Sequence, residues 1–387
     1  MNASRTPGIR TRLQLTALYA GGFLGPFGGG VVTSMLPEIG DGLGVDAAAA
    51  ATSLTAYLLP FALVMLVSGT LGARWGRMRT VRIAYGVYLA ASLACFVAPT
   101  LDLFLAARVL QGCANAFTTP LLLAALAAMT PQQTLGRALG AFGALQAAGQ
   151  TTAPLIGGLA AEANWRLAFL AIAVVAAVLG AVGLPDAARA APTGPPARLR
   201  DALRPTVLRV GAVALLGWGA LGGLGFLVAF RTENVFGLDP AMRGLLLTGF
   251  GVAGIVTARP VGNLIDRIGA RRTVLVGAVA GAVLVAVAGT VGSVAVVAAA
   301  WFVSGVASQF ILVGVNAAVL GGDGGNRGGA VSVVQSLRFG GSALAPLALT
   351  PVYAAHPYGA FLVPALLLAV LPPLLMPRSR DSATGSR

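Results

Sequence analysis

The sequence predicts an all-helical integral membrane protein, with twelve transmembrane helices arranged as two pseudo-symmetric six-helix bundles. Three observations carry this prediction: composition, the spacing of long apolar runs, and an internal repeat. Of the 387 residues, 57% are hydrophobic and only 10% are charged, and the mean hydropathy is +0.85. About a quarter of the residues are charged in an average soluble domain. A soluble core could not enclose this much apolar surface, so we expect the chain to lie in a lipid bilayer.

The chain contains a duplication with an offset of 193 residues. The segment from Gly262 to Arg272, GNLIDRIGARR, repeats the segment from Gly69 to Arg79, GTLGARWGRMR. Each copy is a short basic connection between two long apolar runs, so both halves place the same arginine-rich hairpin on one side of the membrane. The residues of interest in the two copies are Gly69, Arg74, Gly76 and Arg79, and Gly262, Asp266, Arg267, Gly269 and Arg272.

The apolar runs predict twelve membrane spans. A bilayer core needs about 20 apolar residues per helix, and runs of this kind lie near 14–36, 50–72, 80–99, 102–129, 137–161, 165–185, 208–230, 242–265, 273–291, 294–320, 328–354 and 358–376. A proline- and arginine-rich stretch separates the sixth span from the seventh and is typical of a solvated linker. We therefore expect an N-terminal bundle at 1–185, a cytoplasmic linker at 186–207, a C-terminal bundle at 208–376 and a cytoplasmic tail at 377–387.

The arginines predict the orientation. All 26 basic residues are arginine; 20 fall on the side that holds the termini and three on the other side. Cytoplasmic connections carry the excess of positive charge in membrane proteins, so we expect a multi-pass protein of the cell membrane with both termini in the cytoplasm. The net charge of +14 is explained by this pattern, and we expect no nucleic-acid partner.

Three motifs resemble those of the major facilitator superfamily, specifically its twelve-span drug:proton antiporter branch. The GNLIDRIGARR segment fits the family's loop signature, a gating motif whose acidic residue, here Asp266, is implicated in latching the cytoplasmic side. The resemblance implies the same gating role for the first copy, which has Ala73 in place of the acidic residue. In the fourth span, Arg108, Gln111 and Gly112 match the family's Arg-x-x-Gln-Gly, whose arginine is implicated in proton coupling. The fifth span matches the antiporter signature with Gly140, Gly149, Ala153, Pro154, Gly157 and Gly158. The resemblance covers nearly the whole chain and implies two bundles that rock about a central cavity.

The fifth-span motif also has a physical interpretation of its own. Positions 149, 153 and 157 are four residues apart, so they form one helix face without large side chains, and a neighbouring helix can pack into it. Pro154 removes one backbone donor and bends the helix. A tightly sealed face of this kind limits leakage through the protein.

Polar residues at helical spacing predict the lining of a cavity. Substrate sites of such transporters lie near the bilayer midplane between the two halves. The candidate residues for substrate binding or coupling are Arg108, Gln111 and Asn115 in span four, Trp301 and Ser304 in span ten, and Gln335 and Arg338 in span eleven. Hydrogen bonding between helices is the alternative explanation of such stripes. Arg338 lies near the membrane centre, where a charged group is costly and marks a functional candidate.

No Asp or Glu lies in the middle of a predicted span, so a cavity with arginines favours neutral or anionic substrates over cations. We expect secondary active transport, namely proton-coupled efflux of a small amphipathic compound such as a drug or secondary metabolite. The alternatives are an uptake symporter or facilitator for an organic anion, with Arg338 as carboxylate clamp, and a non-transporting receptor of the same fold. We expect a monomer that works with protons in the lipid bilayer, with no cofactor, no metal and no enzymatic activity, since no nucleophile and base pair is recognisable.

Overall fold

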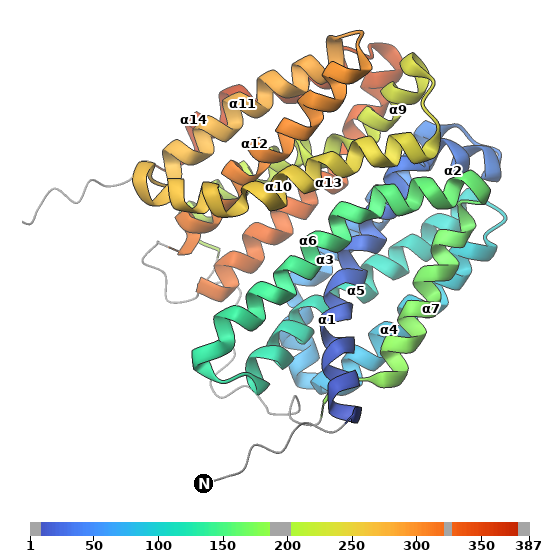
Figure 1. Cartoon of the computed structure of the whole chain (residues 1–387), viewed down its shortest axis with the longest axis vertical. Coiled ribbons are helices and arrows are strands. Elements are labelled where there is room, and N and C mark those ends of the chain that lie inside the picture. The colour runs from blue at the N-terminus through green and yellow to red at the C-terminus, as the bar shows by residue number, and fades with distance from the viewer. Residues whose placement is uncertain (1–8, 186–202, 321–326, 378–387) are drawn as a thin grey trace, which may run out of the picture.

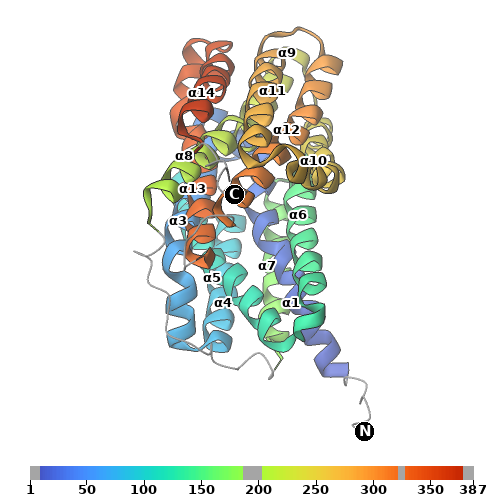
Figure 2. The same ribbon diagram turned by 90° about the vertical axis from the view of Figure 1, so that its left-hand side faces the viewer.

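The computed structural model describes residues 9–185, 203–320 and 327–377, and every regular element within these ranges is helical. The first half consists of α1 (Ile9–Gly30), the 3-10 turn η1 (Val31–Ser34), α2 (Leu36–Leu43), α3 (Ala47–Trp75), α4 (Arg77–Val97), α5 (Leu101–Met129), α6 (Gln132–Ala163) and α7 (Arg166–Val182). The second half consists of α8 (Pro205–Ala220), η4 (Gly222–Leu224), α9 (Gly225–Phe236), α10 (Pro240–Ile268), α11 (Ala270–Thr290), α12 (Val294–Leu320), α13 (Arg327–Ala355) and α14 (Gly359–Leu375). Figure 2 shows the two bundles one above the other, as predicted.

The repeat seen in the sequence recurs in the local structure of helix ends. Asp46 caps α3 by accepting a hydrogen bond from the Ala49 backbone nitrogen (2.6 Å), and Asp239, 193 residues later, caps α10 in the same way. The hairpins also correspond, because α3 and α10 end at Gly76 and Gly269 with φ of 89° and 81°. Only glycine adopts such values without strain, which explains why both hairpins keep it.

Eight segments of the described residues are long and apolar enough to cross a membrane, two of them made of joined elements, α1 with η1 and α8 with η4 and α9. Helices α7 and α14 are shorter apolar helices of 17 residues. The two remaining long helices, α6 and α13, are less apolar. Both lie at a seam between the halves, α6 against α10 and α13 against α3. A polar side chain at a seam finds protein partners instead of lipid, as Ser336 does by donating to the Ala62 carbonyl oxygen (2.6 Å).

The first and seventh predicted spans are interrupted at corresponding positions. Instead of one helix near 14–36, α1 passes through η1 into α2, and instead of one helix near 208–230, α8 passes through η4 into α9. Glycine runs at Gly28–Gly30 and Gly222–Gly223 coincide with these breaks, since glycine is a weak helix former. Residues 186–202 of the predicted linker and residues 378–387 of the predicted tail lie outside the described residues.

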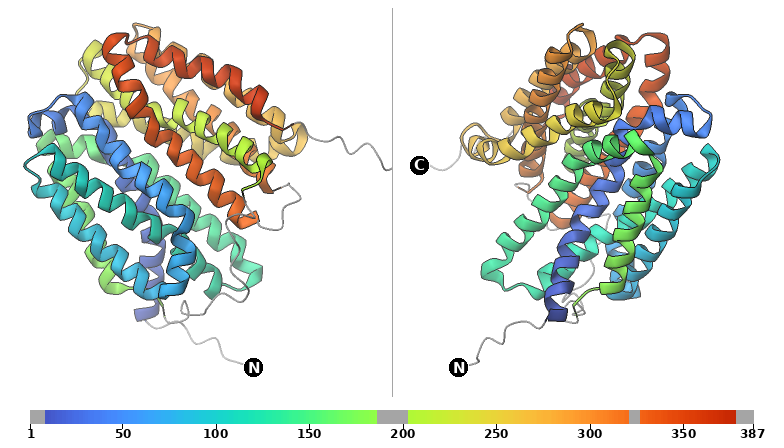
Figure 3. Two further views of the ribbon diagram at one scale, coloured as in Figure 1. Left: turned by 180° about the vertical axis from the view of Figure 1, so that it is seen from behind. Right: turned by 45° about the vertical axis from the view of Figure 1, so that its right-hand side comes forward.

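The two halves meet at one side of the molecule and diverge at the other. We call the side of the Gly76 and Gly269 hairpins the arginine-rich side, and the side of α2 and the α9–α10 connection the opposite side. In Figure 1 the end of α6 lies beside the start of α10 at the opposite side, whereas the start of α6 and the α10–α11 hairpin are far apart. Figure 3 shows the second seam from behind, with α13 in orange beside α3 in light blue.

Candidate functional site

Arg108 is the centre of a buried polar cluster inside the first bundle. Its Nη1 donates to the Gly28 carbonyl oxygen of α1 (2.9 Å) and to Oε1 of Gln111 (2.8 Å), and its Nε donates to the Ser53 carbonyl oxygen of α3 (3.5 Å). The guanidinium carbon lies 4.3 Å from the centroid of the Tyr57 ring. The arginine is fully buried and ties three helices of one bundle together.

The rest of the span-four stripe belongs to the same cluster. Gln111 donates from Nε2 to the hydroxyl of Ser92 on α4 (2.8 Å). Asn115 is also buried, and its Oδ1 lies where a Cβ on Gly25 of α1 would stand. In this conformation the stripe is therefore enclosed within the first bundle and makes helix-to-helix contacts, which was the alternative to lining an open cavity.

The second half repeats this arrangement with different chemistry. Trp301 takes the place of Arg108, and its ring stacks on Phe250 (4.9 Å between centroids), 193 residues after Tyr57. Its Nε1 donates to the Leu247 carbonyl oxygen of α10 (3.3 Å). A guanidinium on a phenol ring in one half is thus matched by an indole on a phenyl ring in the other. Ser304 donates to the Ala300 carbonyl oxygen of its own helix (2.8 Å) and is fully buried.

Two glycines make these paired contacts possible. A Cβ on Gly112 of α5 would overlap the Tyr57 carbonyl oxygen of α3, and a Cβ on Gly305 of α12 would overlap the Phe250 carbonyl oxygen of α10. Both glycines allow the backbones to approach at the same position of the repeat.

Gln335 and Arg338 lie elsewhere, in a shallow recess of the second bundle. The recess lies between α8, α12 and α13, and it is lined by Asn316 and Trp218 besides these two residues. The Arg338 guanidinium carbon lies 4.5 Å from the centroid of Trp218 and 4.4 Å from that of Phe339. The structure thus separates Arg108 and Arg338 into different bundles instead of bringing them to one point.

The glycine face of α6 contacts α1, as its spacing suggests. Gly149 lies against the Phe23 carbonyl oxygen, Ala153 against Gly30, and Gly157 against the Val31 carbonyl oxygen. Other members of the motif face the second half: Gly158 lies against the Pro240 carbonyl oxygen, and the Pro154 carbonyl oxygen lies against Gly244. Gly140 has open space around it.

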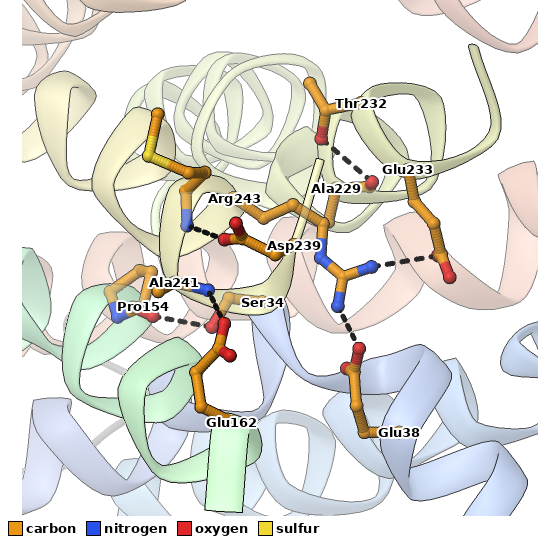
Figure 4. Close-up of polar contacts among 11 residues, drawn as sticks. Ser34, Glu38, Pro154, Glu162, Ala229, Thr232, Glu233, Asp239, Ala241 and Arg243 are labelled. Atoms are coloured by element: carbon orange, nitrogen blue, oxygen red, sulfur yellow. Dashed lines mark hydrogen bonds and ion pairs between the residues drawn. The ribbon is translucent and has the colours of Figure 1, made fainter. Parts of the chain in front are cut away.

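A cluster of charged residues at the opposite side joins the halves, and the sequence analysis did not identify it. We call Glu38 (α2), Glu233 (α9) and Arg243 (α10) the charged closure (Figure 4). Arg243, 1% exposed, forms an ion pair with Glu38 across the halves and one with Glu233 within its own half (3.1 Å). Nearby, Glu162 of α6 accepts a hydrogen bond from the Ala241 backbone nitrogen of α10 (3.2 Å).

The signal for this cluster was present but sparse. Only three arginines were expected on this side, and Arg243 is one of them. The sequence also places Glu38 and Glu233 at the ends of other spans on this side. It does not show which helix ends meet in space, and the ion pairs of Arg243 depend on that. The other two, Arg166 and Arg231, donate to carbonyl oxygens at corresponding helix ends, those of Ala98 and Val291.

The two hairpin motifs face open space at the arginine-rich side. Side chains of Arg74, Arg79, Asp266, Arg267 and Arg272 are exposed, and a Cβ on any of Gly69, Gly76, Gly262 or Gly269 would meet nothing within 4 Å. Asp266 has no ion pair with any described residue. The side chain of Ala73 is outside the described residues. No group of three metal-ligating side chains occurs in the part of the chain that the structure describes.

Comparison with known proteins identifies relatives of the chain. It matches the family model described as Major Facilitator Superfamily over residues 18–239 and again over 210–387. It is 33% identical over 175 residues to the MFS-type transporter Rv1250 of Mycobacterium tuberculosis, covering 44% of this chain and 30% of the relative. It is 30% identical over 163 residues to the drug efflux pump JefA of the same species, covering 42% of this chain and 32% of that protein. The chain thus spans about a third of the length of these curated relatives.

A solved structure shares the fold. The crystal structure of a bacterial homologue of the human lysosomal transporter Spinster, inward-facing and unoccupied, has a TM-score of 0.72 at 15% identity. The alignment covers 96% of this chain and 95% of that chain.

Proposed function

Because the chain belongs to the major facilitator superfamily, we propose that it exports a small amphipathic compound in exchange for protons by alternating access. The family consists of multi-pass membrane transporters and not of enzymes. We further propose that the substrate is a neutral or anionic drug or secondary metabolite. The drug efflux pump JefA, one of the relatives, supports the direction of transport.

The observation that carries the proposal is the contact between α6 and α1. Gly149, Ala153 and Gly157 bring the two helices together along the antiporter motif, and Pro154 and Gly158 of the same stretch of α6 pack on α10 of the second half. A seam without large side chains excludes water and ions between the helices, which is what strict exchange requires.

The polar residues support the proposed substrate class. Every acidic residue of the described helices lies near a helix end. The recess of the second bundle contains Arg338 and no carboxylate. A cationic substrate would be desolvated beside a like charge there. Neutral and anionic compounds avoid that cost.

The conformation supports a cytoplasmic entry route. We propose that the arginine-rich side is cytoplasmic, following the distribution of arginines, and that the bundles are the units 1–185 and 208–376, linked by 186–207. The halves are joined at the opposite side by Arg243 and Glu38, so the state described is one that loads from the cytoplasm. We propose that the protein works as a monomer in the cell membrane.

The test uses energised inverted vesicles and a compound to which a deletion strain becomes sensitive. Addition of the compound should alkalinise the vesicle lumen, and a protonophore should abolish its accumulation. Gly149→Val fills the α1 face of α6 and should reduce coupled transport, whereas Gly143→Ala, on the same helix with open space around it, serves as control. Accumulation that ignores the protonophore would defeat the coupling proposal.

Uptake of an organic anion is a second candidate, and the arginine in the recess favours it. In that case Arg338 clamps a carboxylate that enters from outside. Whole-cell measurements separate the two candidates, because an importer raises the cellular content of labelled substrate and an exporter lowers it.

A further inference from the structure

The recess of the second bundle contains three polar side chains that have no hydrogen-bonding partner among the described residues. Arg338, Gln335 and Asn316 share this recess, and none of them makes a hydrogen bond or an ion pair with any described residue. Nε of Arg338 and Oε1 of Gln335 are buried atoms. Buried polar groups in proteins are almost always hydrogen-bonded, so two buried unsatisfied atoms at one place, with the Asn316 carboxamide beside them, point to a ligand.

Arg108 shows that this chain can satisfy an arginine inside a bundle. It donates three hydrogen bonds to α1, α3 and α5 from Nε and Nη1, although its Nη2 has no partner. Arg338 donates no hydrogen bond to any described residue and has two ring contacts. An arginine inside the membrane is costly and is found where it has a partner or a function. A structural role would be expected to provide hydrogen bonds, as it does for Arg108.

The surroundings of Arg338 determine the geometry of a ligand. Trp218 and Phe339 hold the guanidinium by ring contacts at 4.5 and 4.4 Å, which leaves its edge for a partner. The edge of a guanidinium donates two parallel hydrogen bonds to a planar carboxylate. The two carboxamides add donors and acceptors beside it.

The remaining wall of the recess is apolar. It is formed by Ala214, Ile311, Leu312, Val315 and Val334. One cationic group in such a wall neutralises one negative charge, and a second uncompensated charge would be costly to desolvate. We propose that Arg338, Gln335 and Asn316 form a subsite for the carboxylate of an aromatic monocarboxylic acid, with Trp218 beside the ring. This inference rests on the proposed function, whose substrate class it narrows.

The subsite is connected to the seam between the halves. Phe339 packs edge-on against Phe61 of α3 (4.9 Å between centroids), and Ser336, two residues before Arg338, donates to the Ala62 carbonyl oxygen (2.6 Å). A ligand on Arg338 therefore lies next to the contacts that hold α13 against α3. A bound ligand would therefore be able to change the contact between α13 and α3, which joins the two bundles.

The test measures equilibrium binding of 1-naphthoate to the full chain in lipid nanodiscs, without any gradient. The matched probes are neutral 1-naphthamide and cationic 1-naphthylmethylammonium. The native protein should prefer the carboxylate by about 10- to 100-fold, because a hydrogen bond to a charged group contributes about 1.5–3 kcal/mol. Equal binding of naphthoate and naphthamide to the native protein would overturn the proposal without any variant.

Variants assign the preference to the recess. Arg338→Gln should remove the preference for the carboxylate. Arg338→Lys should keep part of it, because the charge remains and the forked geometry is lost. Asn316→Leu and Gln335→Leu should weaken the binding of naphthoate without removing a charge. Arg259→Gln, at an exposed arginine of α10, is the control and should bind like the native protein. A preference that survives in Arg338→Gln contradicts the subsite. If that protein does not fold, a preference that is undiminished in both leucine variants contradicts it.

Binding and transport can fail separately. Loss of carboxylate selectivity in a protein that still exchanges protons for a neutral drug removes the subsite and leaves the proposed function. Selective, Arg338-dependent binding in a protein that moves no protons removes the proposed coupling and leaves the subsite.

Discussion

Arg243 pairs with Glu38 across the two bundles and with Glu233 inside one of them. One buried guanidinium thus serves two carboxylates, of which only the first holds the halves together. Glu38 and Glu233 share Arg243 as their partner but lie in different halves of the protein. Replacing each carboxylate in turn therefore distinguishes the contact between the halves from the contact within one half.

Glu38→Gln should favour opening at the opposite side. Removing this ion pair should destabilise the closed contact at the opposite side by roughly 1–3 kcal/mol, a value between those of exposed and buried ion pairs. This corresponds to about a 5- to 150-fold shift in the ratio of open to closed protein. Spin labels at Ala163 and Val235, exposed positions at the ends of α6 and α9, report the distance between the halves in a variant without the two native cysteines. The matched control is Glu233→Gln, which keeps the inter-half pair and should shift the distance less. An equal or larger shift in the control would contradict this assignment.

Gly112→Ala and Gly305→Ala should both destabilise the fold. Each added Cβ would meet a backbone carbonyl oxygen, at Tyr57 and Phe250 respectively, and backbone cannot move aside as a flexible side chain can. Overpacking of this kind costs about 1–3 kcal/mol, measured as a lower temperature of unfolding in detergent. Gly140→Ala has open space and should be neutral or slightly stabilising, since alanine is the better helix former. Similar losses at all three positions would show that the close contacts are not responsible.

Arg108→Met should destabilise the first bundle and abolish transport. The substitution leaves the Gly28 carbonyl and Gln111 without their donor, at about 1–3 kcal/mol for each unsatisfied buried group. Arg108→Lys should be intermediate, because it keeps the charge without the fork. Trp301→Phe keeps the ring on Phe250 and loses one hydrogen bond, so it should cost less than Arg108→Met. Full transport by a folded Arg108→Met protein would reduce Arg108 to a structural residue.

Asp266→Asn should leave the unfolding temperature nearly unchanged and reduce transport. The carboxylate is exposed and without an ion pair to described residues in this conformation, so its contribution to this state is small, within about 0.5 kcal/mol. We expect Asp266 to act as a latch in the other conformation, in which the arginine-rich side is closed. Ala73→Asp restores the acid missing from the first copy and should slow opening at that side. Unchanged transport rates in both variants would argue against a latch in either hairpin.

Much of the fold was predictable because its signals are local. Apolar runs longer than a bilayer crossing predict helices wherever they occur, and the glycines at 76 and 269 mark the ends of two hairpins by their φ requirement. The breaks in the first and seventh spans were not predicted, since a hydropathy window averages over the short glycine runs at 28–30 and 222–223. The charged closure was missed because Glu38, Glu233 and Arg243 are up to 205 residues apart.

By itself, the sequence determined that this chain is helical, duplicated and suited to a membrane, since composition and the 193-residue repeat are properties of the linear chain. Only the tertiary structure decided which polar residues are satisfied. Arg108 and Arg338 look alike in the sequence, each on a polar stripe of an apolar helix. Arg108 donates hydrogen bonds to carbonyl oxygens of α1 and α3. Arg338 contacts two aromatic rings and donates no hydrogen bond to any described residue. A hydrogen bond needs its partner within about 3 Å, and that distance is set by the packing of helices far apart in the chain.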